Sequence, residues 1–180
     1  ESFIAAGTPI EAFVHDPATL RWFCHDEVAQ CRPVMATMLA EGWTLGDDVL
    51  ATTLADHARA LLAAGPPPLD DASLEQLRYE ITDAIDDLMG ERPADEHVAL
   101  GVQLQPLLVR LALRRRGSWE ATGKHLPRQL RRVDDDFAAR FTAAFRRLCG
   151  EGEPDAVITL AEAELDACGG ACFEGYRRHA

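Results

Sequence analysis

The chain has 180 residues and a formal net charge of −12, with 30 aspartates and glutamates against 18 lysines and arginines. This length fits one domain, or one domain with a fragment of another. The negative charge argues against sequence-independent binding to nucleic acid, because that affinity depends on cationic contacts to phosphates. No apolar run approaches the length that spans a membrane. We therefore expect neither a nucleic-acid nor a membrane partner.

The cysteines favour a reducing compartment. Their number is odd, and no two of them form a Cys-x-x-Cys pair. Reduced thiols in a cytoplasmic protein explain this pattern better than the alternatives, which are disulfide bonds or a metal site. The five residues are Cys24, Cys31, Cys149, Cys168 and Cys172.

The first fifteen residues differ in pattern from the rest of the chain. Apolar and other side chains alternate from Thr8 to His15, which predicts a short β-strand. Its only carboxylate, Glu11, is either a solvent-facing residue of an edge strand or a metal-binding or general-base group of a catalytic sheet. A lone strand is not stable, so its partner strands are either missing from this chain or belong to something else. The chain therefore divides into 1–15 and 16–180.

From Asp16 onward the pattern predicts α-helices almost throughout. Their starts are marked by N-cap residues such as Asp16, Asp47 or Asp48, and Ser73, each followed by apolar residues at helical spacing. Gly65–Pro68 is expected to be a stiff turn that is too short to link domains. The predicted fold is an all-α bundle of about seven to eight helices with a short N-terminal strand. The expected helices cover about 17–31, 33–42, 48–64, 73–89, 94–116, 122–133, 134–148 and 154–169.

Lys124 is the only lysine of the chain and lies in a short basic stretch. Lysine is a compact point charge on a flexible stem, which suits contacts to phosphate. Thr122 and Gly123 are expected to leave free backbone N–H groups at a helix N-terminus, and such groups favour an anion. Arg128 follows one helical turn later on the same face. The stretch is either a phosphate site or an ordinary basic surface, and its spacing is not that of a P-loop.

The helix expected at 73–89 has an acidic face. Glu80, Asp83 and Asp87 share this face at helical spacing. An ordinary solvated surface explains such a face. The functional alternative is a carboxylate-lined pocket for a cationic, amine-bearing ligand, which carboxylates would hold by charge-assisted hydrogen bonds.

Several stretches of the chain carry a resemblance to a known family. They are Pro9–Asp16, Arg32–Pro33 with Met38–Gly42, Gly65–Pro68, Leu77–Asp83 with Asp86–Leu88, Gly117–Trp119, Gly123–Arg128 and Phe173–Arg178. Together they resemble bacterial nucleotidyltransferases of the polymerase-β superfamily, and more closely its two-domain, antibiotic-adenylyltransferase-like members. In those proteins a small mixed sheet precedes a helical substrate-binding bundle. The resemblance spans nearly the whole chain.

The resemblance implies that 1–15 is the last strand of a nucleotidyltransferase core and that 16–180 is a substrate- and nucleotide-binding domain. Glu11 would be the third carboxylate of the catalytic sheet and the general base that deprotonates an acceptor hydroxyl. Two aspartates elsewhere in that sheet would hold Mg²⁺, and ATP would be the donor. The partners implied are thus a nucleotide, a small-molecule acceptor and an N-terminal catalytic domain.

The same resemblance implies roles for residues of the helical part. Lys124 and Arg128 would contact the nucleotide phosphates. Tyr79, Asp83 and Asp87 would line the acceptor side. The chain lacks the Gly-Ser turn and the Asp-x-Asp strand of the family, so we expect it to be inactive without a catalytic core from another segment or chain.

Three hypotheses of function follow. The first is the helical domain of a nucleotidyltransferase that transfers AMP from ATP to a hydroxyl acceptor. The second is a non-catalytic helical binding module, such as an antitoxin-like partner of a separate nucleotidyltransferase. The third is a helical ribonuclease, because Arg92 and His97 have the arginine, four residues, histidine spacing of that class, although Pro93 departs from its usual polar residue.

Overall fold

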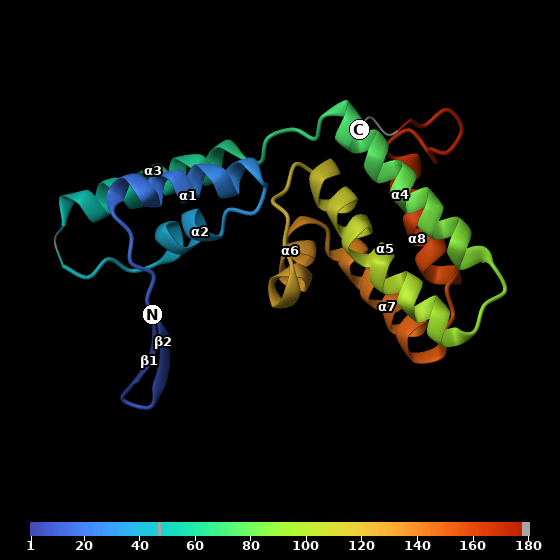
Figure 1. The fold of residues 1–180 in the computed structure, drawn as a ribbon, viewed down its shortest axis with the longest axis horizontal. Helices are drawn as coiled ribbons and strands as arrows, with labels where there is room; N and C mark the ends of the chain where they lie inside the picture. The colour runs from blue at the N-terminus through green and yellow to red at the C-terminus, as the bar shows by residue number, and fades with distance from the viewer. Residues whose placement is uncertain (47, 178–180) are drawn as a thin grey trace. The chain divides into compact units, whose positions relative to one another are not determined.

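A computed structural model of the chain describes residues 1–46 and 48–177 (Figure 1). The predicted all-α fold with short N-terminal β-structure is confirmed. Asp47, one candidate helix cap, and Arg178, the end of the last matching stretch, lie outside the described residues. The elements are β1 (Ser2–Ala5), β2 (Thr8–Glu11), α1 (Pro17–Ala29), α2 (Val34–Glu41), α3 (Val49–Ala64), α4 (Asp71–Met89), α5 (Ala94–Arg115), the 3-10 turn η1 (Gly123–His125), α6 (Leu126–Val133), α7 (Asp135–Glu151) and α8 (Asp155–Asp166).

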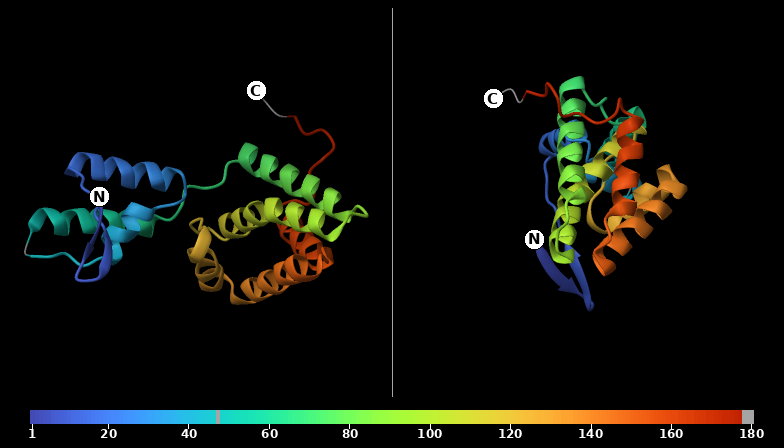
Figure 2. Two further views of the ribbon diagram at one scale, coloured as in Figure 1. Left: turned by 60° about the horizontal axis from the view of Figure 1, so that its bottom comes forward. Right: turned by 90° about the vertical axis from the view of Figure 1, so that its right-hand side faces the viewer.

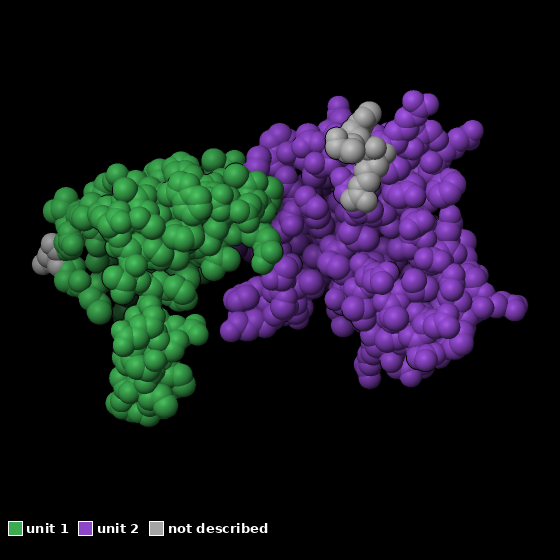
Figure 3. All heavy atoms as spheres, viewed as in Figure 1, with its two compact units in different colours: residues 1–65 green, residues 66–180 purple. Residues whose placement is uncertain are grey.

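The chain divides into two compact units at the bond between Gly65 and Pro66 (Figure 3). This boundary falls inside the stretch that the sequence predicted as a stiff turn too short to link domains. Gly65 ends α3 with a φ of +77°, a value that favours glycine. The prolines that follow cannot continue the helix. The stretch therefore does stop the helix, as expected, and it also separates the two units.

The first unit begins with a two-stranded hairpin rather than a lone strand. Ser2 lies opposite Glu11, and Ala5 lies opposite Thr8, in an antiparallel pair. The turn residues Ala6 and Gly7 have φ values of 48° and 79°, as two-residue hairpin turns require. The strand thus has a partner in this chain, which corrects the expectation that none is present. It also ends at Glu11 instead of continuing to His15.

Three helices complete the first unit, and all three pack on one another. Asp16 caps α1, because its Oδ1 accepts hydrogen bonds of 2.9 Å from the N–H groups of Ala18 and Thr19. Asp48 caps α3 through a 2.8 Å bond from the Leu50 N–H. The buried core cluster of this unit is small and consists of Cys24, Ala36 and Ala58.

The second unit is a bundle in which α4, α5, α7 and α8 pack alongside one another (Figures 1 and 2). The apolar spacing expected for the fourth helix is confirmed, because Leu77, Ile81, Ile85 and Leu88 are all buried. Its expected cap was wrong, because Asp70 caps α4 and accepts a hydrogen bond from the Ser73 N–H. The helix α5 continues through Pro106. Aromatic side chains of α7, leucines of α5 and apolar side chains of α6 and α8 fill the rest of the core.

The short helix α6 packs on α7 and starts later than the sequence suggests. The pattern predicts a helix from Thr122, but residues Gly123–His125 form a 3-10 turn and the α-helix begins at Leu126. Pro127 has no N–H to donate to the Gly123 carbonyl at α-helical spacing. The Leu126 N–H bonds that carbonyl instead, which gives the tighter 3-10 geometry.

Candidate functional site

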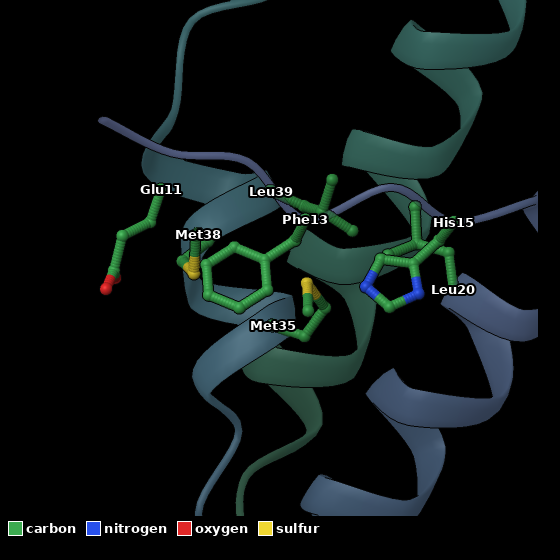
Figure 4. Close-up of a pocket in the computed structure, with 7 residues that line it drawn as sticks. All are labelled: Glu11, Phe13, His15, Leu20, Met35, Met38 and Leu39. Carbon is green, nitrogen blue, oxygen red and sulfur yellow. The ribbon is translucent and has the colours of Figure 1, made fainter. Parts of the chain in front are cut away.

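Glu11 lies at the edge of a cavity of about 300 Å³ in the first unit (Figure 4). The cavity is lined mainly by apolar side chains of the segment after β2 and of α1 and α2. Glu11 stands on one side of it, and His15 stands on the other. The sequence did not predict this cavity, because the residues that line it come from several separate elements and follow no single periodic pattern. They are Glu11, Phe13, His15, Leu20, Met35, Met38 and Leu39.

His15 brings an unsatisfied polar atom to this cavity. Its Nε2 is buried and has no hydrogen-bond partner among the described residues, while its ring makes an edge contact with Phe23 at a centroid distance of 5.1 Å. Buried polar atoms usually have a partner, so an unmatched one beside a cavity marks a place where a ligand or a water would be held. Glu11 and His15 are the two ionisable residues among those that line this largely apolar cavity.

The second candidate region is the turn that carries Lys124. Lys124 and Arg128 are both exposed, and within the described chain neither side chain forms an ion pair or hydrogen bond. Gly123 has a φ of +54°, which turns the backbone into η1. Two unpaired cations at the start of a helical segment suit an anion such as a phosphate. The structure thus leaves the predicted phosphate ligands exposed to solvent.

The loop before η1 is fixed from both of its ends. Gln129 donates a 2.7 Å hydrogen bond to the Ser118 hydroxyl, and Glu120 accepts a 3.1 Å bond from Arg110 Nε. The buried Arg114 donates to the Pro67 carbonyl, and its Nε lies 3.8 Å from Glu120. These contacts tie Ser118 to α6 and Glu120 to α5.

Among the described residues, the predicted residues on the acidic face of α4 have different surroundings. Asp83 is exposed, and Asp87 forms a 2.7 Å ion pair with Arg92. Tyr79 stacks on Tyr176 and Phe173, at centroid distances of 4.1 and 6.1 Å. The chain after α8 therefore covers Tyr79, whereas Asp83 faces solvent.

Arg78 holds that C-terminal segment in place. Its guanidinium donates to the carbonyls of Gly170 and Gly169 at 2.8 Å each and lies 3.4 Å from that of Ala171. The Cys172 N–H donates a 3.1 Å bond to the Thr82 hydroxyl. These partners are some ninety residues apart in the sequence, so no local pattern could reveal the contact.

The two groups of predicted residues in the second unit lie on different elements. Lys124 and Arg128 belong to η1 and α6, which packs on α7, whereas Tyr79, Asp83 and Asp87 belong to α4, which packs on α5 and α8. In Figures 1 and 2, α6 and α4 occupy separate parts of the bundle. Glu11 belongs to the other unit. The predicted site residues are thus not gathered into one site within either unit.

Arg92 and His97, the residues of the ribonuclease hypothesis, line a second cavity of about 480 Å³. Both ring nitrogens of His97 already face backbone carbonyls, with Nδ1 3.1 Å from Gly152 and Nε2 3.2 Å from Gly90. Arg92 is bonded to Asp87 and lies 3.6 Å from Glu96. Both side chains are therefore occupied in holding the ends of neighbouring helices together.

The second unit contains a group of ion pairs around Glu164 that holds its helices together. Glu164 is buried and accepts hydrogen bonds from Arg116 and Arg115, the shortest at 2.7 Å. Burial opposes ionisation of Glu164, but these arginines outweigh it and hold the pKa of Glu164 below its ordinary value. The Phe137 N–H and then Arg116 similarly hold the pKa of Asp134 below its ordinary value.

The described residues contain no group of three or more histidine, cysteine, aspartate or glutamate side chains placed to hold one metal ion. The described residues therefore do not supply an all-protein cage for Mg²⁺, an ion that one or two carboxylates usually hold together with substrate phosphates. The exposed cations Lys124 and Arg128 do fit the phosphates of a nucleotide.

No helix in the part of the chain that the structure describes is long and apolar enough to cross a membrane. Comparisons of the chain with protein families, with curated proteins and with solved structures found no match.

Proposed function

We propose that this chain is the helical substrate- and nucleotide-binding part of a cytoplasmic nucleotidyltransferase, which transfers AMP from ATP to a hydroxyl acceptor. The observation that carries the proposal is the hairpin that ends in Glu11. All eight of its strand residues are exposed, and within the described chain each strand pairs only with the other. An isolated two-stranded hairpin is marginal in water, so this one is suited to extending a larger sheet.

In this proposal Glu11 acts at the junction between that sheet and the helices. Its carboxylate is exposed and adjoins an apolar cavity, so an acceptor whose body lies in the cavity would bring a hydroxyl to it. Glu11 would take the hydroxyl proton as general base. Lys124 and Arg128 would bind phosphate oxygens and orient the donor. Mg²⁺, when bound, would neutralise phosphate charge on carboxylates that the catalytic sheet provides.

We propose that the acceptor is a small molecule. The acidic face of α4 favours an acceptor that carries an amine. Asp83 is the exposed carboxylate available for such a contact, because Asp87 is paired with Arg92. A cationic ligand would be bound most tightly if it contacted Asp83 and Asp87 together, which requires Arg92 to release Asp87.

The test uses the coding sequence that precedes Glu1. If it encodes a Gly-Ser turn and an Asp-x-Asp strand in the same frame, the longer protein should release pyrophosphate from ATP in the presence of an acceptor. In that protein, Glu11→Gln should lower kcat by about 100-fold or more, and Lys124→Ala should raise the KM for ATP. The 180-residue chain alone should turn over no ATP. If kcat and the KM for ATP were unchanged in both variants, Glu11 would not be the general base and Lys124 would not bind the nucleotide.

The second candidate is a non-catalytic binding module that docks on a separate nucleotidyltransferase. The specific observation that favours it is the number of large apolar side chains that the first unit exposes, among them Trp43 at 95% and Leu45 at 94%. A stop codon and a separate reading frame upstream, together with a stable complex between the two products, would support this candidate instead.

A further inference from the structure

Two histidines of the first unit face each other across a helix pair. His25 on α1 and His57 on α3 have their Nε2 atoms 3.2 Å apart. Their ring centroids are separated by 5.1 Å, with an angle of 51° between the planes. Two rings placed head to head on one line would have centroids farther apart at this nitrogen separation. The two rings are therefore not collinear, an arrangement that both a hydrogen bond between them and a shared ion allow.

The separation matches that of two ligands on one metal ion. Imidazole nitrogens bind Zn²⁺ at about 2.0–2.1 Å in tetrahedral sites, which places two such nitrogens about 3.3 Å apart. A hydrogen bond between the rings needs one Nε2 to keep its proton, whereas a metal ion would use the lone pairs of both. An imidazole pair prefers ions of the zinc, nickel and copper type to Mg²⁺ or Ca²⁺.

The surroundings allow an ion to enter. His25 is exposed and His57 is half-buried, so solvent reaches the pair. No third histidine, cysteine, aspartate or glutamate joins these two among the residues described. Water molecules would fill the other positions of the ion, as they do in open metal sites.

We propose that His25 and His57 form a binding site for a divalent transition-metal ion, with Zn²⁺ as the representative ion, that links α1 to α3. The link joins two helices whose own shared core is small. A ligand that binds only the folded state stabilises it by mass action, so the ion raises the Tm of the first unit. The site does not depend on the proposed nucleotidyltransferase function.

The test is a titration of the full chain, first freed of metal by a chelator, with zinc chloride. Calorimetry should show one ion per chain, and the imidazole NMR signals of both His25 and His57 should change together. Changes beside metal ligands already weaken binding by about 10–100-fold, so His25→Ala and His57→Ala should each weaken it by at least about tenfold. Alanine suits both helical positions, and both variants should fold.

The matched control is His125→Ala, which removes an exposed histidine of the second unit and should bind zinc like the unaltered chain. Three results would overturn the proposal. The first is no zinc binding by the unaltered chain, and the second is a loss of affinity in only one of the two variants. The third is equal binding of Mg²⁺, which would assign the ion to carboxylates.

Discussion

At the scale of single residues, Glu164 is a buried carboxylate that pairs with two arginines at the end of α5, Arg115 and Arg116. Its carboxylate neutralises Arg116 and Arg115, and Arg116 also contacts Asp134 and the ring of Phe137. Removing the Glu164 carboxylate would leave the largely buried Arg116 with Asp134 as its remaining ionic partner. The network therefore makes the stability of the bundle sensitive to both substitution and acid.

We predict that Glu164→Gln lowers the free energy of unfolding at pH 7 by about 2 kcal/mol. Folding lowers the pKa of Glu164 below its unfolded value of about 4.5. Ionised Glu164 therefore contributes fully to the free energy of unfolding above about pH 4.5, and this contribution is lost as the pH falls through the lower pKa of the folded state. The variant should therefore lose less stability than the unaltered chain between pH 5 and 3. Urea unfolding at several pH values measures both effects.

Glu162→Gln is the control for this prediction, because Glu162 lies on the same helix and is exposed. It should change the free energy of unfolding by less than about 0.5 kcal/mol. If the two substitutions changed the free energy of unfolding equally, the ion pairs of Glu164 would not stabilise the fold more than an exposed glutamate does.

At the scale of elements, the sequence predicted what local rules determine. Helix starts at Asp16, Asp48 and Pro154 follow from capping residues and prolines, and the buried stripe of α4 follows from its spacing. The hairpin was missed because its turn, Ala6-Gly7, is not a strong turn pair. Of the candidate site, the strand of Glu11 was predicted, but its cavity and the histidine pair join separate elements and leave no local trace.

Close packing between α5 and α7 gives a prediction at this scale. A Cβ at Gly101 would collide with the buried side chain of Leu148, whereas one at Gly150 would meet nothing within 4 Å. Gly101→Ala should therefore destabilise the chain by about 1–3 kcal/mol. Gly150→Ala should stabilise it by up to about 1 kcal/mol, because alanine favours the helix. Thermal unfolding of the two variants tests this, and the same sign for both would contradict it.

The C-terminal segment depends on one side chain of α4. Arg78→Ala removes the donor to the carbonyls of Gly169 and Gly170, so the segment should open more often. The Cys172 amide, which bonds Thr82, should then exchange with deuterium faster, while amides in the α5 core keep their rates. Arg59→Ala, which removes only an exposed ion pair, should leave the Cys172 rate unchanged.

At the scale of the whole molecule, the two units differ in how much apolar surface they bury. The second has a continuous core drawn from α4, α5, α6, α7 and α8. The first has only Cys24, Ala36 and Ala58 in its buried cluster. A unit of this size with so small a core is marginal, because small domains bury a smaller share of their surface.

We predict that a fragment beginning at Pro66 folds alone with a cooperative thermal transition. The fragment 1–65 should unfold with a lower midpoint, or show no cooperative transition at all. Circular dichroism of both fragments and of the full chain measures this. If fragment 1–65 unfolded at the same temperature as the fragment that begins at Pro66, the prediction from the sizes of their buried cores would be wrong.

The hairpin has a consequence for how the protein behaves in solution. Its strands carry exposed apolar side chains, such as Phe3 and Ile4. Their outer edges pair with no other strand of the described residues, so another strand could add there. The formal charge of −12 keeps copies of the chain apart at low ionic strength. Salt screens that repulsion over about 10 Å at 0.1 M and leaves apolar attraction intact. Raising the salt concentration should therefore promote self-association, and low-salt buffers are the better choice for storing the protein.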